Sequence, residues 1–300
     1  MTIAERVVVC APAKVNLCLH VGARRADGYH DLESLVAFVE HGDRIRLAAD
    51  TRLSMSVSGP FGAGVPSGED NLALRAARLL ASKIDARTGA RISVRKNIPI
   101  AAGLGGGSAD AAAVLRGLIA LWNPEPDRQA LYDIAASLGA DVPICVTSAT
   151  AWIEKRGEKI TALPPLPKLW LLLVNPGVPL STASVFAKLD RRRGLGLACP
   201  REAFADAQAL VRFLASTGND LQRPACALAP VIAAVLEELE RLPGVLLARM
   251  SGSGATCFGL FATRGAARAA ATGLKNCRPG WWIVDTAVAT GRTVVPLPDQ

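Results

Sequence analysis

A glycine-rich segment between two apolar stretches has the clearest chemical meaning in this chain. Residues 103–107 contain four glycines in five positions, and an apolar run that predicts a helix over 109–122 follows. A backbone without Cβ atoms can adopt positive φ and approach phosphate oxygens, so that N–H groups and the amino end of the helix surround an anion. We expect a phosphate-binding loop formed by Pro99, Gly103, Leu104, Gly105, Gly106, Gly107, Ser108 and Ala109.

Two common nucleotide-binding loops do not match this segment. The Gly-Lys-Ser/Thr ending of a P-loop is absent, and the glycine spacing differs from the dinucleotide-binding pattern. A plain flexible loop is the alternative, but such a loop is rarely followed at once by a helix that begins with small residues. The segment therefore predicts phosphate binding through the backbone.

Two charged residues far apart in the sequence are candidates for phosphoryl transfer to a hydroxyl. That reaction needs an acceptor for the hydroxyl proton and positive groups that face the developing negative charge. Asp141 lies between Gly139, which suits the left-handed end of a helix, and Pro143, so its carboxylate can project into a cleft. Lys14 lies between two apolar strand-like segments, where an unpaired ammonium is costly to bury. We predict that Lys14 pairs with Asp141; the alternatives are a surface turn aspartate and a peripheral strand lysine.

The elements that must position these residues are both helices and strands. Apolar patterns predict strands over 7–10, 16–21, 44–47, 91–98, 169–174 and 281–288, and a hairpin over 150–160 that turns at Arg156-Gly157. Helical spacing predicts helices over 72–83, 109–122, 128–138, 203–215 and 229–241. A second glycine loop covers 251–254, with a strand before it and another helix after it. The fold class is therefore α+β.

The length of the chain indicates two domains. At 300 residues it exceeds the size at which one hydrophobic core keeps growing. A proline-rich stretch over 164–167 lies between the predicted hairpin and the strand over 169–174, and it is typical of a linker. We place the boundary between residues 165 and 166.

Composition excludes several classes of protein. The seven cysteines are odd in number, widely separated and without a Cys-x-x-Cys pair, which favours reduced thiols. The start of the chain lacks the pattern of a secretion signal, and its most apolar stretch is far shorter than the ~20 residues of a membrane-spanning helix. We expect a cytoplasmic protein without a membrane partner, and its state, monomer or homodimer, stays open.

The net charge of +8 raises the question of nucleic acid. The only tight basic run is Arg191-Arg192-Arg193, which has no interleaved aromatic residues and is more typical of a solvated loop. A positive surplus also suits polyphosphate ligands, because it raises the rate at which anions are encountered. We therefore expect no nucleic-acid partner.

Three motifs together resemble those of the galactokinase, homoserine kinase, mevalonate kinase and phosphomevalonate kinase superfamily. They are the glycine segment over 99–112, the amino-terminal segment Ala11-Pro12-Ala13-Lys14-Val15-Asn16-Leu17, and the late loop Met250-Ser251-Gly252-Ser253-Gly254-Ala255. They occur in order and span nearly the whole chain. The resemblance implies a two-domain α+β kinase fold with ATP and substrate in the inter-domain cleft. It assigns ATP binding and catalysis to residues 1–165 and the substrate side to residues 166–300.

Within that superfamily the chain is most similar to the diphosphocytidyl-methylerythritol kinases. The similarity lies in the short segments 26–30, 139–143, 175–177 and 219–221, which are weak singly and distinctive together. It implies phosphorylation of the 2-hydroxyl of 4-diphosphocytidyl-2-C-methyl-D-erythritol in the non-mevalonate isoprenoid precursor pathway. Asp141 matches the catalytic base of that family, and Lys14 matches the lysine that assists it.

The resemblance also implies the residues that contact the ligands. Tyr29 and Phe186 are expected as aromatic faces for a cytosine ring, with His30 as its hydrogen-bonding partner. Asn16 and Thr182 complete the substrate contacts. Asn71 is expected near the adenine, and Lys96 at the edge of the nucleotide.

Magnesium is expected to accompany ATP. Phosphates, waters and Ser108 would hold it, and no dedicated cage of protein ligands is visible in the sequence. Many relatives carry a second serine where this chain has Ala109, which leaves Ser108 as the expected hydroxyl contact.

Three alternatives stay open from the sequence. A sibling kinase that acts on mevalonate or homoserine has no reason to carry the segment 27–30. An ATP sensor without catalysis does not need both Lys14 and Asp141. A nucleic-acid-binding protein is suggested only by the net charge.

Overall fold

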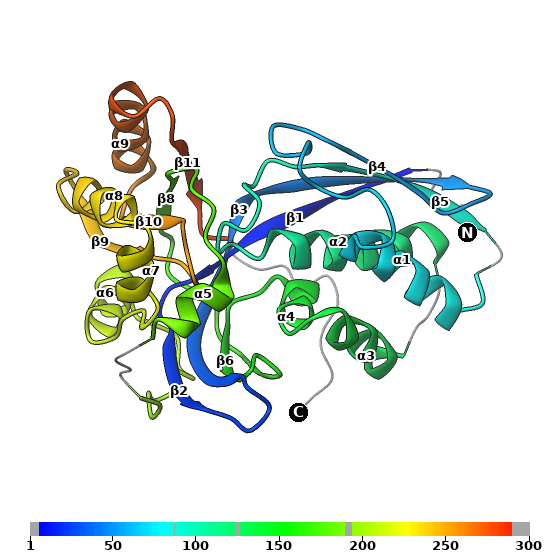
Figure 1. Ribbon diagram of the computed structural model, residues 1–300, viewed down its shortest axis with the longest axis horizontal. Helices are drawn as coiled ribbons and strands as arrows, with labels where there is room; N and C mark the ends of the chain where they lie inside the picture. Colours follow the sequence, from blue (N-terminus) through cyan, green and yellow to red (C-terminus); the bar gives the residue numbers. More distant parts are fainter. Residues whose placement is uncertain (1–5, 87, 124–126, 190–193, 290–300) are drawn as a thin grey trace.

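Two β-sheets with their own helices lie side by side in the computed structural model (Figure 1). The structure describes residues 6–86, 88–123, 127–189 and 194–289. The basic run 191–193 and the first five residues lie outside this part of the chain. Among the described residues, no helix has both the length and the hydropathy needed to cross a membrane.

The first sheet is built around one long strand. Its strands are β1 (Arg6–Asn16), β2 (His20–Arg24), β3 (His30–Asp50), β4 (Ser54–Ser58), β5 (Gly89–Arg95), β6 (Ala151–Lys155) and β7 (Lys159–Ala162). β3 has 21 residues and pairs antiparallel with β1, β2, β5 and β6. β4 pairs parallel with β5, and β7 antiparallel with β6. β3 therefore connects nearly every strand of this sheet.

The burial of β3 follows its sequence. Toward its end, Ile45 and Leu47 point into the core while Arg44 and Arg46 are exposed, the alternation expected when one face of a strand meets water. Its middle, residues 35–39, is apolar throughout, and both faces of it are buried in two different hydrophobic clusters. The strand thus passes from the edge of the molecule into the region between the two sheets.

Helices cover one face of the first sheet. They are α1 (Leu72–Lys83), α2 (Gly106–Trp122), α3 (Arg128–Leu138) and α4 (Val142–Thr147). α2 is rich in alanine and buried along almost its whole length, which lets its backbone lie close to β1 and β3. This close packing fixes the amino end of α2, where the glycine segment is located.

The second sheet has the strand order β11-β8-β10-β9, and all its pairs are antiparallel. Its strands are β8 (Trp170–Asn175), β9 (Val245–Met250), β10 (Cys257–Phe261) and β11 (Trp282–Ala287). The helices of this part are α5 (Thr182–Ala187), α6 (Ala207–Ala215), α7 (Gln222–Leu228), α8 (Val231–Glu240) and α9 (Arg264–Cys277).

The two sheets share a hydrophobic core. One cluster joins Leu35 and Trp152 of the first sheet to Leu171 and Phe258 of the second. In addition, Arg249 donates from Nη1 to the carbonyl oxygen of Leu17 at 2.8 Å. β7 ends at residue 162 and β8 begins at residue 170, so the predicted boundary at 165 falls between the sheets; the division into domains stays a prediction.

The α+β class is confirmed, and several element boundaries differ from the sequence predictions. The strand predicted over 16–21 is wrong, because β1 ends at Asn16 and β2 begins at His20. The strand predicted over 44–47 is only the end of β3. β3 can continue through residue 42 because Gly42 has no side chain and packs directly on β1. A Cβ there would lie 2.2 Å from the Ala11 carbonyl oxygen. Gly139 has φ 155° and ψ 157°, a positive φ that residues with a Cβ rarely adopt, but not the left-handed helical conformation predicted for it.

Candidate active site

The glycine segment forms a tight loop that leads from β5 into α2. Gly103 and Gly105 have φ of 73° and 64°, a region that residues with a Cβ rarely adopt. α2 begins at Gly106, three residues before the predicted start, so the N–H groups of its first turn lack intrahelical partners. These groups and the positive end of the helix dipole are suited to an anion.

The other two motifs hold this loop in place. The backbone N–H of Lys14 donates to Leu104 O at 2.9 Å, and Thr256 N donates to Ala102 O at 3.2 Å. Ser251 Oγ donates to Gly103 O at 3.0 Å. A Cβ on Gly103 would lie 2.5 Å from the Ser251 carbonyl oxygen, so the second glycine loop is packed directly against the first. The three motifs therefore form one site.

Lys14 and Asp141 form the predicted ion pair. Lys14 Nζ donates to Asp141 Oδ2 at 2.8 Å, with side-chain exposures of 7% for the lysine and 40% for the aspartate. Lys14 extends from β1 beneath the loop, since a Cβ on Gly105 would lie 3.2 Å from its Cε. Asp141 directly precedes α4, and its Oδ1 has no protein hydrogen bond among the described residues. This oxygen is available to a ligand.

Two cavities meet at Asp141. The loop cavity, of about 360 Å³, is lined by both glycine loops together with Lys14 and Asn16. The tyrosine cavity, of about 900 Å³, is lined by Tyr29, His30 and residues from both ends of α5. Both are lined by Leu32, Ser108, Asp141, Arg156, Thr182 and Phe186. The carboxylate of Asp141 thus faces both spaces.

Four of the five predicted substrate residues, all except Asn16, line the tyrosine cavity. His30 stacks on Phe186 with ring centroids 5.4 Å apart and an interplanar angle of 25°. His30 Nδ1 lies 3.0 Å from Gly22 O, which fixes the imidazole ring. Tyr29 is 57% exposed, and Thr182 Oγ1 lies 2.8 Å from Ser253 Oγ on the second glycine loop.

Asn16 is buried at the border of the loop cavity. Its Nδ2 donates to Ser34 Oγ at 2.8 Å, and its backbone N–H donates to Ser251 Oγ at 3.1 Å. The predicted substrate residues are therefore brought together, with Asn16 on the loop side and the aromatic rings on the other.

Several predicted nucleotide residues do not line either cavity. Leu104 and Ala109 are buried in the core beneath the loop, and Pro99 is half-buried behind it. Asn71 caps α1, since its side chain accepts from Ala73 N at 2.8 Å and donates to Pro66 O at 2.7 Å. Only its neighbour Leu72 reaches the loop cavity.

Lys96 is buried beneath the loop and lines neither cavity, and its place at the edge of the nucleotide stays a prediction. Its Nζ donates to Asp110 Oδ2 at 2.6 Å and also to the fully buried Asp43. Such an ammonium needs these carboxylates, because a buried charge without partners is costly. Burial and the carboxylate of Asp43 raise the pKa of Asp110 to about 7, although the Lys96 ammonium opposes this shift.

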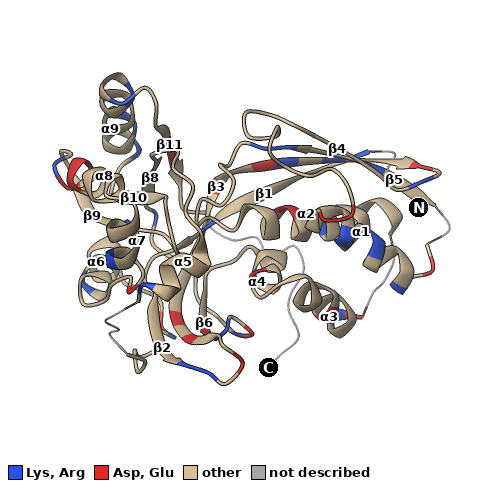
Figure 2. Cartoon of the chain, viewed as in Figure 1, with Lys and Arg blue, Asp and Glu red and all other residues tan. Residues whose placement is uncertain are grey.

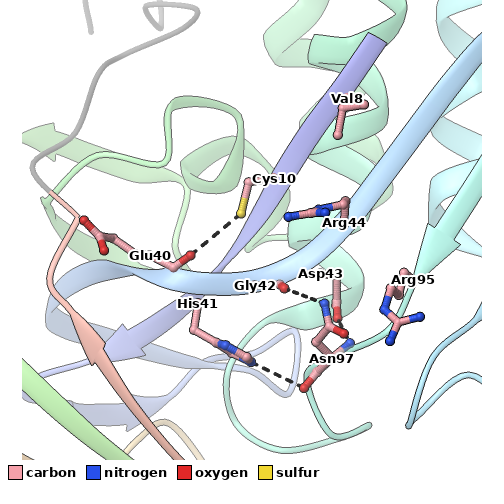
Figure 3. Close-up of a pocket in the computed structure, with 9 residues that line it drawn as sticks. All are labelled: Val8, Cys10, Glu40, His41, Gly42, Asp43, Arg44, Arg95 and Asn97. Atoms are coloured by element: carbon pink, nitrogen blue, oxygen red, sulfur yellow. Dashed lines mark hydrogen bonds between the residues drawn. The ribbon is translucent and has the colours of Figure 1, made fainter. Parts of the chain in front are cut away.

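A further cavity of about 510 Å³ lies on the outer face of the first sheet (Figure 3). Arg44 and Arg95 line it together with His41, whose pKa is lowered mainly by burial. None of its lining residues lines the loop or tyrosine cavity, and none is a predicted site residue. We assign it no part in the chemistry at Asp141.

Arg156 and Ser253 line these cavities but were not predicted as site residues. Ser253 belongs to the late glycine loop and could have been found from that motif. Arg156 lies at a hairpin turn, where a basic side chain usually faces water, so the sequence gives no signal for it.

Comparison with known proteins identifies the family of this chain. Residues 71–149 match the family described as GHMP kinases N terminal domain, and residues 198–279 match GHMP kinases C terminal. A 4-diphosphocytidyl-2-C-methyl-D-erythritol kinase of Paracoccus denitrificans is 49% identical over 282 residues, which cover 94% of this chain and 97% of that protein. The protein of the same name from Parvibaculum lavamentivorans is 47% identical over 286 residues, with coverage of 92% and 96%.

A solved structure is similar over nearly the same length. The crystal structure of a 4-(cytidine 5'-diphospho)-2C-methyl-D-erythritol kinase has a TM-score of 0.77 and 35% identity, and the match covers 94% of this chain and 100% of that one. The family expected from the motifs is therefore confirmed. The chain is an ATP-dependent GHMP kinase and belongs to the 4-diphosphocytidyl-2-C-methyl-D-erythritol kinase family.

Proposed function

We propose that this enzyme transfers the γ-phosphoryl group of ATP to the 2-hydroxyl of 4-diphosphocytidyl-2-C-methyl-D-erythritol, in the non-mevalonate isoprenoid precursor pathway. The observation that carries the proposal is the position of Asp141, which lines both cavities and has a carboxylate oxygen free of partners among the described residues. The names of relatives 47% and 49% identical to the chain support the choice of acceptor.

The loop cavity would hold the phosphates of ATP. The N–H groups at the start of α2 and the positive φ of Gly103 and Gly105 support this assignment, because they allow close backbone contact with phosphate oxygens. Asn71 stays a proposed neighbour of the adenine, since the adjacent Leu72 lines the same cavity.

In this proposal Asp141 accepts the proton of the 2-hydroxyl through Oδ1 while the hydroxyl oxygen attacks the γ-phosphorus in line. The bond from that phosphorus to the β-γ bridging oxygen breaks, ADP leaves, and the proton passes from Asp141 to solvent. Lys14 fixes Oδ2 and places a positive charge beside the developing negative charge.

Magnesium fits this site as an ion carried by ATP. No three His, Cys, Asp or Glu side chains gather as metal ligands in the described part of the chain, so phosphates and waters would supply most ligands. Ser108, which lines both cavities, would add its hydroxyl as a further ligand. When bound, the ion would neutralise charge on the phosphate oxygens.

The tyrosine cavity would hold the cytidine end of the acceptor. Tyr29 and Phe186 offer aromatic faces, and His30, already fixed by Gly22 O and by its stacking on Phe186, is oriented for one hydrogen bond to the base. Thr182 and Asn16 would contact the part of the acceptor nearest Asp141.

We also propose the division of labour between the halves of the chain. Residues 1–165 would bind ATP and supply Lys14 and Asp141, and residues 166–300 would complete the substrate side. The shared core and the packing of the second glycine loop on the first support a cleft formed by both halves.

An ADP-release assay tests the proposal. The purified protein is incubated with Mg-ATP and, separately, 4-diphosphocytidyl-2-C-methyl-D-erythritol, mevalonate, homoserine or galactose. We expect turnover with the first compound only, and the Asp141→Asn protein serves as the control for background ATP hydrolysis. Turnover with mevalonate or homoserine alone would overturn the assignment.

A further inference from the structure

Arg156 stands at the junction of the two cavities but has no established task. It lies in the turn between β6 and β7, between Lys155 and Gly157, whose φ values are 58° and 111°. This turn directs the side chain back over the site, so that Arg156 lines the loop cavity and the tyrosine cavity at once. Its guanidinium carbon lies 4.1 Å from the centroid of the Tyr29 ring.

The charge of this guanidinium is only partly compensated by protein. Its closest carboxylate contact is with Asp27, where Nη1 and Oδ2 lie 3.8 Å apart, too far for a hydrogen bond. Its Nε is buried and has no hydrogen-bond partner within the described ranges of the chain. The face of Tyr29 orients the group through a cation–π contact but accepts no directed N–H bond from its fork of donors. Donors therefore remain for a ligand.

The chemical structure of the proposed acceptor indicates which of its groups would lie beside Arg156. As its name states, a diphosphate joins the cytidine to the methylerythritol. When the base lies at Tyr29 and His30 and the reacting hydroxyl lies at Asp141, the two phosphates must span the space between them. Arg156 lines the same cavity as Tyr29 and Asp141, and its guanidinium lies against the Tyr29 ring.

We infer that Arg156 binds the diphosphate of the acceptor and that Tyr29 positions its guanidinium for this contact; the inference rests on the proposed function. A planar guanidinium can donate two parallel N–H bonds to phosphate oxygens, which a lysine ammonium cannot do. Arg156 thereby selects a nucleoside diphosphate over a nucleoside monophosphate. It is a specificity residue, distinct from Lys14, which acts at the hydroxyl.

The experiment compares the wild type with Arg156→Met and Arg156→Lys. Arg156→Met keeps most of the length of the side chain and removes its donors. We expect the KM for the acceptor to rise about 10- to 100-fold, the range for charged hydrogen bonds. The KM for ATP should change by less than about two-fold, and Arg156→Lys should be intermediate. Lys155→Met is the matched control, because it removes one charge from the same turn at a residue that lines neither cavity.

Competitive inhibition isolates the diphosphate contact. Cytidine, CMP and CDP are tested against the acceptor, and CDP should bind wild type and Lys155→Met more tightly than CMP. In Arg156→Met this advantage of CDP should fall about ten-fold, the loss expected for one charged hydrogen bond, while cytidine binding is unchanged. Two results with a folded Arg156→Met protein would overturn the inference but leave the proposed function standing. One is an unchanged ratio of the inhibition constants of CMP and CDP, and the other is a raised KM for ATP in place of a raised KM for the acceptor.

The proposed function fails in a different way from the inference. If the wild-type protein neither phosphorylates the acceptor nor binds any cytidine compound, both are refuted. Thermal unfolding of each variant is measured beside the kinetics, and Arg156→Lys supplies the comparison if Arg156→Met does not fold. An Arg156→Lys protein that still binds CDP over CMP as strongly as the wild type would show that a guanidinium is not needed.

Discussion

Lys14 Nζ and Asp141 Oδ2 lie 2.8 Å apart although the two residues are 127 positions apart in the chain. β1 carries the lysine under the glycine loop, and the aspartate directly precedes α4. Because the lysine is buried and the aspartate is partly exposed, the cation is fixed by protein while the carboxylate can still reach a ligand. The pair therefore connects the glycine loop to the tyrosine cavity.

Replacement of the proposed base should separate turnover from binding. Asp141→Asn keeps the shape of the side chain but cannot take the hydroxyl proton, so we expect kcat to fall by at least ~10²-fold. The affinity for ATP should stay within a few fold, because Asp141 acts on the hydroxyl. Steady-state kinetics and calorimetry with ATP measure both effects. A variant that keeps more than about a tenth of the wild-type kcat would argue against Asp141 as base.

A Cβ at Gly105 should strain the backbone of the glycine loop and crowd the side chain of Lys14. In Gly105→Ala the new methyl group would be forced into the left-handed region, at a cost of ~1–2 kcal/mol, and would lie 3.2 Å from Lys14 Cε. We expect weaker ATP binding and a lower free energy of unfolding. Gly265→Ala in α9 is the control, because nothing lies within 4 Å of its Cβ. Unchanged ATP affinity in the Gly105 variant would contradict the phosphate-loop assignment.

Loss of the exposed Tyr29 ring should weaken binding of the acceptor and leave binding of ATP unchanged. Base–aromatic stacking contributes roughly 1–3 kcal/mol per base, so Tyr29→Ala should raise the acceptor KM about five- to two-hundred-fold. Because uracil reverses the hydrogen-bonding group at ring position 4, UDP should inhibit less well than CDP. An unchanged acceptor KM together with equal inhibition by UDP and CDP would remove the cytosine assignment.

Asp110 should make stability depend on pH. Its pKa in the folded protein is raised from 3.8 to about 7, mainly by burial, so the folded state binds a proton that the unfolded state has released between about pH 4 and 7. The contribution of this group to the free energy of unfolding therefore falls as pH rises through that window. The change is on the order of 1.4 kcal/mol per pKa unit.

Asp110→Asn should remove this decline. The measurement is urea unfolding of both proteins at pH 5 and pH 8. The change in the free energy of unfolding from the lower to the higher pH should be more negative for the wild type than for the variant. Equal changes would mean that Asp110 is already ionised throughout this range, with Lys96 compensating its charge.

Like charges on the outer face of the first sheet should be mildly destabilising. Arg44 on β3 lies directly opposite Arg95 on β5, and Figure 2 shows basic residues along these strands. Arg95→Thr should raise the free energy of unfolding by roughly 0.2–1 kcal/mol in low salt, and the gain should shrink at high concentrations of NaCl. Arg91→Thr is the control, because Arg91 faces Ala48. Equal gains in both variants would assign the effect to the threonine itself.

The sequence predicted a structural feature best where nearby residues alone determine it. The ends of α1 match residues 72–83, since the apolar spacing lies within the helix and the cap at Asn71 directly precedes it. That Lys14 needs an anionic partner followed from the cost of burying an ammonium. The choice of Asp141 as this partner also needed the resemblance to the kinase family.

Long-range contacts decided what the sequence did not show. The burial of Lys96 depends on Asp43, which lies 53 residues earlier on β3. α4 and α5 have six residues each, too few to show a helical period. Arg156 enters the site only because its hairpin pairs with β3 and returns beside Tyr29.

The contact between Arg249 and Leu17 has a consequence for synthesis on the ribosome. The two residues are 232 positions apart, and a β-bridge likewise joins Leu19 to Asn219. At about 5–20 residues per second, the carbonyl of Leu17 waits roughly 10–50 s for its partner after it is made. The second glycine loop, at 251–254, emerges later still. A nascent chain that stops before Arg249 thus carries both Lys14 and Asp141 but lacks the second glycine loop and the strands β10 and β11, so kinase activity would mark almost complete translation.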